Sequence, residues 1–125
     1  MIKQLTKAEE QVMQILWNIN EGVVKDLVDN FEEPRPAYTT VATVLKVLET
    51  KGFVAKKKIG NTYLFSPNIT KNDYTHFQFS NLLSNYFNGS FPKMATFFAR
   101  ENKLSISELE EMMKMAEEEL KKENK

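Results

Sequence analysis

One stretch of the chain, residues 36–67, combines a helical pattern with two strand patterns and a run of lysines. Residues 37–46 place their apolar side chains at helical spacing. Residues 53–58 follow a few positions later, begin with β-prone side chains and end in three consecutive lysines. The pair Gly60-Asn61 is typical of a tight hairpin turn, and residues 60–65 supply a second β-prone run. This order predicts a helix followed by a two-stranded hairpin with one basic arm.

The helix in this stretch has two different faces. At 100° per residue, its apolar side chains form one stripe and its threonines lie on the opposite side with a lysine. The apolar positions are Val41, Val44, Leu45 and Leu48, and the polar positions are Thr39, Thr43, Lys46 and Thr50. Threonine is a mediocre helix former, so folding alone gives no reason to prefer it. Short hydroxyl side chains suit a helix that lies in the major groove of DNA, although an ordinary amphipathic helix with exposed threonines gives the same pattern.

Charge is unevenly distributed along this neutral chain. Residues 35–66 hold six basic residues against one acid, whereas residues 101–125 hold eight glutamates against five lysines. A phosphate-binding surface needs local positive potential, and the acidic tail cancels that potential only in the total. The lysines Lys56, Lys57 and Lys58 would contact the DNA backbone if the preceding helix lay in the groove. They would also protect an edge strand from aggregation, and the two roles are compatible.

Two short helices are expected before the two-faced helix. Thr6 and Glu9 have the spacing of a capping box, which predicts a helix start at this point. A second helical series, residues 24–31, ends before Pro34 and Pro36. Two short helices before a third, with a hairpin after it, are the order of a winged helix-turn-helix. We therefore expect a mainly α fold with a small β-hairpin.

The composition changes beyond the hairpin, and we place a domain boundary there. Residues 1–68 are expected to form a winged-helix DNA-binding domain, and residues 69–125 a helical dimerisation region with a capping box at Ser107 and Glu110. The second region carries more apolar surface than it can bury alone, so a second copy of the chain is the natural cover, with a ligand pocket as the alternative. The predicted dimer interface comprises Tyr74, Phe77, Leu82, Tyr86, Phe87, Met94, Phe97, Phe98, Leu109, Met112, Met113, Ala116 and Leu120.

The sequence shows no pattern typical of an enzyme or a metal site. It has no cysteine and a single histidine, His76, so disulfides and thiolate metal sites are excluded. No nucleophile-base pair or phosphate-binding glycine loop is found. Charged residues interrupt the amino-terminal stretch that a signal peptide would need. We expect a cytoplasmic protein that is not an enzyme, holds no cofactor or metal and does not insert into a membrane.

The first and third helices carry specific sequence motifs. The first helix carries Leu5-Thr6-Lys7-Ala8-Glu9 and Val12-Met13-Gln14-Ile15-Leu16-Trp17. The third carries Ala37-Tyr38-Thr39-Thr40-Val41 and Leu48-Glu49-Thr50-Lys51-Gly52. These motifs resemble those of the penicillinase repressor family of bacterial transcriptional repressors, and the resemblance covers nearly the whole chain. It implies a homodimer held by the carboxyl-terminal helices, which binds inverted-repeat operators in double-stranded DNA through two winged helices and blocks transcription.

The resemblance also implies residues for DNA contact and for relief of repression. The DNA-contact positions of the family carry over onto Tyr38, Thr39, Thr40, Thr43 and Lys46 of the third helix and onto Lys57, Lys58 and Asn61 of the hairpin, and we add Arg35 from its charge and position. Copper-responsive members use a cysteine-rich motif, which this chain lacks. Antibiotic-responsive members are cut at an Asn-Phe bond of the dimerisation arm in a membrane sensor protease pathway. The matching pair here is Phe97-Phe98.

Two other functions are compatible with the predicted fold. A winged helix can use the same surface to dock a protein, which would make the chain an adaptor. The aromatic residues of the second region could instead hold a small molecule, which would make it a ligand-sensing regulator. The arrangement of the basic side chains on the folded surface separates the adaptor from a DNA-binding protein.

Overall fold

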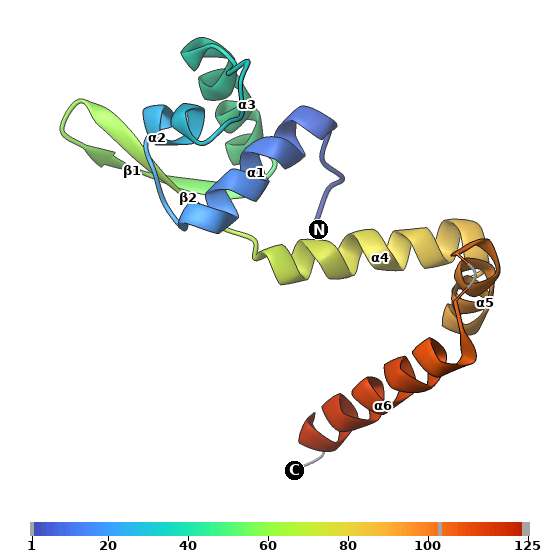
Figure 1. Cartoon of the computed structure of the whole chain (residues 1–125). Coiled ribbons are helices and arrows are strands. Elements are labelled where there is room, and N and C mark those ends of the chain that lie inside the picture. The colour runs from blue at the N-terminus through green and yellow to red at the C-terminus, as the bar shows by residue number, and fades with distance from the viewer. Residues whose placement is uncertain (1, 103, 124–125) are drawn as a thin grey trace. The chain divides into compact units, whose positions relative to one another are not determined.

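The computed structural model describes residues 2–102 and 104–123 of the chain (Figure 1). In this part of the chain the elements are α1 (Lys7–Ile19), α2 (Val24–Asp29), α3 (Tyr38–Thr50), β1 (Val54–Ile59), β2 (Thr62–Pro67), α4 (Lys71–Phe87), α5 (Phe91–Asn102) and α6 (Ile106–Glu123). Contacts divide the chain into two compact units, one ending at Phe79 and one starting at Ser80. The predicted fold class, mainly helical with one antiparallel hairpin, is confirmed.

The expected capping box at the start of α1 is present. The hydroxyl of Thr6 accepts a hydrogen bond from the Glu9 amide at 3.2 Å, and the Glu9 carboxylate accepts one from the Thr6 amide at 2.9 Å. These two bonds satisfy amides that the first helical turn leaves without partners. They also fix the extended segment that leads into the helix.

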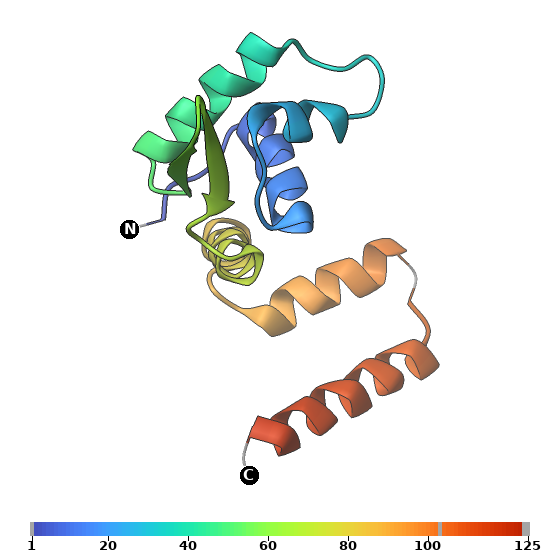
Figure 2. The ribbon, with the colours of Figure 1, turned by 90° about the vertical axis from the view of Figure 1, so that its left-hand side faces the viewer.

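The helices α1, α2 and α3 pack around one apolar core, as a helix-turn-helix requires (Figures 1 and 2). The predicted apolar stripe of α3 is confirmed, because Val41, Leu45 and Leu48 are at most 1% exposed and Val44 is half-buried. Gly52 follows the helix with φ of 82°, the left-handed conformation that a helix C-terminus commonly needs. The opposite face of α3 is thereby left to solvent.

The two strands form the predicted hairpin, which lies against α1 and α3. Its register runs from Val54 opposite Pro67 to Ile59 opposite Thr62, so Gly60-Asn61 make the turn as expected. Gly60 has φ of 58°, which suits a two-residue turn of this kind. Near the base of the hairpin Val54 and Phe65 are buried, whereas β1 is exposed from Ala55 onward. We call the exposed part, residues 56–63, the wing.

The loop between α1 and α2 adds a third backbone partner to the hairpin. The Gly22 amide donates to the Phe65 carbonyl at 3.0 Å, and the Phe65 amide donates to the Gly22 carbonyl at 2.8 Å. A Cβ atom on Gly22 would lie 2.9 Å from Cδ1 of Ile19 and 3.1 Å from Cβ of Asp26. Glycine therefore lets the loop approach its neighbours closely enough to pair with the hairpin.

The first turns of α4 belong to the first unit. Tyr74 is 4% exposed, and its hydroxyl accepts a hydrogen bond from the Leu5 amide at 3.0 Å. Phe77 packs against the same core. Because these side chains complete the first core, the boundary between the units falls after Phe79 and not at residue 68, where the composition changes. The structure likewise corrects the predicted role of Tyr74, which lies in the core and not on a surface open to a partner.

The second unit contains the rest of α4 together with α5 and α6. The rings of Phe87 and Phe97 lie 5.6 Å apart between centroids. The predicted capping box at Ser107 and Glu110 is wrong. The hydroxyl of Ser105 instead accepts from the Glu108 amide at 3.1 Å, and α6 begins at the next residue, Ile106. Both pairs have capping-box spacing, but the earlier start adds the hydrogen bond from the Leu109 amide to the Ser105 carbonyl at 3.1 Å.

Candidate nucleic-acid interface

The face of α3 opposite the core carries the polar side chains that the sequence predicted. This face is continuous along the first three turns of the helix, because its residues recur at spacings of three and four. Tyr38 is 54% exposed. The other four predicted residues of this helix, Thr39, Thr40, Thr43 and Lys46, are also exposed. The structure thus places Thr39, Thr43 and Lys46 on one helix face, with Tyr38 and Thr40 at its two edges.

The threonine hydroxyls on this face are partly engaged within the helix. Thr43 donates its hydroxyl proton to the Thr39 carbonyl at 2.9 Å, and Thr50 donates to the Lys46 carbonyl at 3.2 Å. Bonds of this kind satisfy a hydroxyl donor four residues back along the helix. The Thr43 side chain therefore offers a methyl group and oxygen lone pairs to a ligand, and no free hydroxyl proton.

The three wing lysines do not form a single patch. Successive residues of a strand point to opposite faces, and the register places Lys57 opposite Leu64 but Lys58 opposite Tyr63. The ammonium of Lys56 lies 3.3 Å from a Glu49 carboxylate oxygen and 4.6 Å from the centre of the Tyr63 ring. Lys56 is thus neutralised by α3, while Lys57 and Lys58 form no ion pair within residues 2–102 and 104–123.

Of the two remaining predicted contact residues, one precedes α3 and the other lies in the hairpin turn. Arg35 precedes α3, where its Nε donates to the Phe31 carbonyl at 3.3 Å and its Nη1 lies 3.6 Å from a Glu33 oxygen. Nearly half of the Arg35 side chain, 46%, is still exposed. Asn61 is exposed in the turn of the hairpin. These two residues would contact a ligand at the edges of the binding surface and not at the centre of that surface.

Fewer basic side chains of residues 35–66 are free to bind phosphate than the residue count indicates. Lys51, which follows α3, is an internal partner of Glu9, since the two charged groups are 2.6 Å apart. Lys56 is paired as well, so Lys46, Lys57 and Lys58 remain as the lysines without an ion pair in the described part of this segment. Sequence reasoning missed the Glu9–Lys51 pair, because nothing in the local pattern relates two residues so far apart.

The environment of Glu9 shows that this pair is structural. Burial would by itself raise the pKa of the Glu9 carboxyl, but hydrogen bonds from Lys51 and Thr6 and the charge of Lys51 outweigh it. The pKa of Glu9 therefore lies below its ordinary value of 4.5. Lys51 also reaches the Gln4 carbonyl at 3.4 Å. The pair ties the end of α3 to the start of α1 and leaves the exposed polar face of α3 free.

The predicted dimer residues beyond Phe79 are mostly exposed. The large side chains among them that are exposed have exposed fractions from 41% for Leu82 to 75% for Tyr86. The exposed members are Leu82, Tyr86, Phe97, Phe98, Met112, Met113, Ala116 and Leu120, while Phe87, Met94 and Leu109 are half-buried. Sequence reasoning missed Ile106, which is 76% exposed and extends the same stripe of α6 by one turn. Its spacing of three residues before Leu109 was the available signal.

Two other features are absent from the described residues. Among the described residues, no three histidine or acidic side chains come together as metal ligands. None of the helices in this part of the chain is long and apolar enough to cross a membrane.

A helix-turn-helix with a basic wing and a hydroxyl-bearing third helix defines the winged-helix class of DNA-binding proteins. The profile described as penicillinase repressor matches residues 5–118. The chain is 31% identical over 123 residues to the penicillinase repressor of Bacillus licheniformis, covering 94% of this chain and 92% of the relative. It is 23% identical over 110 residues to the methicillin resistance regulatory protein MecI of Mammaliicoccus sciuri, covering 87% and 89%.

Solved structures agree with the sequence relatives. The DNA-binding domain of the repressor BlaI aligns with a TM-score of 0.52 and 27% identity, covering 59% of this chain and 92% of that one. The monomeric form of Bacillus licheniformis BlaI in complex with the blaP half-operator aligns with a TM-score of 0.50, at the same identity and coverage. This chain belongs to the penicillinase repressor family and is a DNA-binding transcriptional repressor.

Proposed function

We propose that this repressor binds an inverted-repeat operator as a homodimer, with one α3 helix in the major groove of each half-site. The observation that carries the proposal is the exposed face of α3, where Thr39, Thr43 and Lys46 lie opposite the buried stripe. On a helix that lies in the major groove, hydroxyl, methyl and ammonium groups can contact base edges, thymine methyl groups and phosphates. In this arrangement α3 is the recognition helix.

The wing supports the recognition helix through the DNA backbone. Lys57 and Lys58 are exposed on opposite faces of a two-stranded hairpin and lack internal ion pairs in the described chain. Contacts of such lysines with phosphates position a protein without reading sequence. The half-operator complex of the related BlaI supports one winged helix per half-site. Arg35, Tyr38, Thr40 and Asn61 complete the proposed contact set at its edges.

The exposed stripe of α6 supports the homodimer. Ile106, Leu109, Met113, Ala116 and Leu120 follow one another at alternating spacings of three and four residues, the pattern of a two-helix seam. No residue of α6 is buried within the chain. An apolar stripe of this length needs a cover, and two-fold pairing with a second copy provides it. Residues of α4 and α5 from Leu82 to Phe98 would contribute to the same interface.

Relief of repression by proteolysis fits the same design, because cutting the arm would separate two half-site readers. The Phe97-Phe98 bond lies inside α5, so a membrane sensor protease pathway would have to open this helix to reach it. Binding to operator DNA supports a cytoplasmic location for the repressor. The relatives are repressors and not enzymes, which supports a non-enzymatic role.

The dimer is tested with a pair of methionine variants in the same helix. Met113 lies on the stripe and Met115 lies off it, yet they are 64% and 61% exposed. In analytical ultracentrifugation of the full chain, Met113→Glu should shift the protein to the monomer, because a charge in the seam is desolvated without a partner. Met115→Glu should leave the dimer intact. A wild-type chain that sediments as a monomer, or two variants that behave alike, would contradict the proposal.

A further inference from the structure

The segment that joins β2 to α4, residues 68–70, makes a hydrogen bond at each of its residues. The Asn68 amide donates to the Phe53 carbonyl at 2.7 Å, and the Asn68 side chain donates to the Gly52 carbonyl at 3.2 Å. The Ile69 carbonyl accepts a hydrogen bond from the Trp17 indole at 2.8 Å. Thr70 caps α4, because its hydroxyl accepts from the Asp73 amide at 3.0 Å. A segment with these bonds is not a free linker.

Tyr74 anchors the first turn of α4 itself. Its ring lies 5.5 Å from the Phe53 ring in an edge-on arrangement, 6.0 Å from the Trp17 ring and 5.9 Å from the Phe77 ring, measured between centroids. Its hydroxyl holds the amide of Leu5. Burial raises the pKa of this hydroxyl, so it stays protonated over the ordinary pH range. Aromatic pairs at these distances add orientation to apolar burial.

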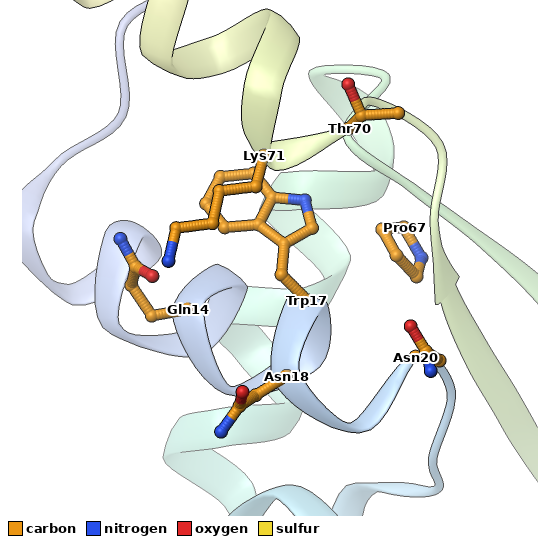
Figure 3. Close-up of a pocket in the computed structure, with 7 residues that line it drawn as sticks. All are labelled: Gln14, Trp17, Asn18, Asn20, Pro67, Thr70 and Lys71. Atoms are coloured by element: carbon orange, nitrogen blue, oxygen red, sulfur yellow. The ribbon is translucent and has the colours of Figure 1, made fainter. Parts of the chain in front are cut away.

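These contacts connect the start of α4 directly to the recognition helix. Lys51 and Gly52 form a short turn after α3 that leads to Phe53, and the Phe53 amide donates to the Leu48 carbonyl at 2.9 Å. Figure 3 shows Trp17 of α1 beside the first turn of α4, with Pro67, Thr70 and Lys71 around the indole. We call the set Trp17, Phe53, Asn68, Ile69 and Tyr74 the junction. All five residues lie within the first unit.

We propose that the junction determines which spacing between half-sites the repressor accepts. It fixes the direction in which α4 leaves the DNA-binding unit, and this direction sets how far apart two recognition helices can lie. The inference rests on the proposed dimer. Trp17 and Tyr74 act as positioning residues, because they are not part of the exposed polar face of α3 and instead hold the start of α4, the helix that leads to the partner.

The physical consequence is a narrow tolerance for spacing. One added base pair rotates a half-site by about a tenth of a helical turn and moves it along the axis. A dimer with a fixed junction can bind the altered site only if the protein or the DNA is deformed. A flexible connection would instead hold the second DNA-binding unit at a similar effective concentration near half-sites at several spacings. Loss of the junction should therefore widen the accepted spacings without changing the sequence read in each half-site.

The test is selection of bound duplexes from a random DNA library, with the full-length wild type and with three variants. Tyr74→Phe removes the hydroxyl and keeps the ring, and Trp17→Phe removes the bond to Ile69. Val24→Ala is the matched control, because it opens the same core at α2, away from the junction. Wild type and Val24→Ala should enrich paired half-sites with one dominant spacing. Both junction variants should enrich the same half-site sequence, either as pairs with several different spacings or as single half-sites.

Affinity measurements on the selected duplex complete the test. Adding one base pair between the half-sites should weaken wild-type binding about tenfold or more and weaken Tyr74→Phe binding much less. Equal losses, a single dominant spacing for both junction variants, or loss of half-site recognition by both of them would overturn the inference. If the wild type enriches no paired half-sites at all, the proposed dimeric function fails instead.

Discussion

Lys51 lies with its ammonium 2.6 Å from a carboxylate oxygen of Glu9, so the residue that ends α3 is bound to the first turn of α1. The same carboxylate also accepts the Thr6 amide in the capping box. One buried acid thus closes a helix start and fixes the end of the recognition helix. The relationship explains why a lysine in the most basic segment of the chain is not available to DNA.

Replacing Glu9 by glutamine should lower the free energy of unfolding at neutral pH. It should also make this free energy fall less as the pH is lowered into the acid range. Because the folded pKa of Glu9 is below the unfolded value, its contribution to the free energy of unfolding is complete above the unfolded value of about 4.5 and is lost as pH falls through the folded pKa. We expect Glu9→Gln to cost about 1–2 kcal/mol at pH 7. Urea unfolding at several pH values measures this, with exposed Glu21→Gln as the control. Parallel pH profiles for wild type and Glu9→Gln would contradict the assignment.

Gly22→Ala should destabilise the first unit. The added methyl would lie 2.9 Å from Cδ1 of Ile19 and 3.1 Å from Cβ of Asp26, at a loop that pairs with Phe65 of the hairpin. Relief of this crowding should cost about 1–3 kcal/mol. Thermal unfolding measures the loss, and Asn18→Ala, at an exposed position of α1, should stay within about 0.5 kcal/mol of wild type. A Gly22→Ala protein as stable as wild type would show that the loop can move away.

Lys57→Ala should reduce the salt dependence of DNA binding more than Lys56→Ala does. Lys57 has no ion pair in the described chain, whereas Lys56 is already paired with Glu49 at 3.3 Å. Loss of one phosphate contact lowers the slope of log affinity against log salt by about 0.9. Fluorescence anisotropy titrations at several salt concentrations give the slope for each variant. A larger change for Lys56→Ala would mean that its bond to Glu49 opens on DNA and that the wing is oriented differently.

Thr43→Ala should weaken discrimination between bases by about 1–3 kcal/mol, while Thr43→Val should retain most of it. The Thr43 hydroxyl proton is engaged with the Thr39 carbonyl, so the methyl group is the part of the side chain best placed to contact a thymine. Thr50→Val is the matched control, because Thr50 makes the same internal bond at the other end of α3. Competition between the selected operator and its single-base variants measures discrimination. Thr43→Val as poor as Thr43→Ala would assign the contact to the hydroxyl oxygen.

Local patterns in the sequence predicted most of the fold. The Thr6 and Glu9 cap, the α3 stripe and the turn at Gly60-Asn61 depend on residues within a few positions of one another, and each is confirmed. The cap at Ser107 failed because an equally spaced serine stands two residues earlier. Local rules cannot choose between such neighbours, since the choice depends on the whole helix.

The arrangement of the site was less accessible from sequence. Charge counting treated Lys51 and Lys56 as free, whereas the fold pairs them with Glu9 and Glu49. Tyr74 looked like part of an apolar arm because composition changes after residue 67, yet its ring completes a core built from residues far away along the chain. Long-range pairing of this kind leaves no periodic signal in one sequence.

We propose that this repressor reads an inverted repeat through two copies of α3. Anisotropy titrations of the full-length chain against the selected inverted-repeat duplex, one isolated half-site and a scrambled duplex, each at several salt concentrations, test this reading. We expect the tightest binding to the inverted repeat, with a steep negative slope of log affinity against log salt. Equal affinity for the scrambled duplex, or a slope near zero, would contradict it.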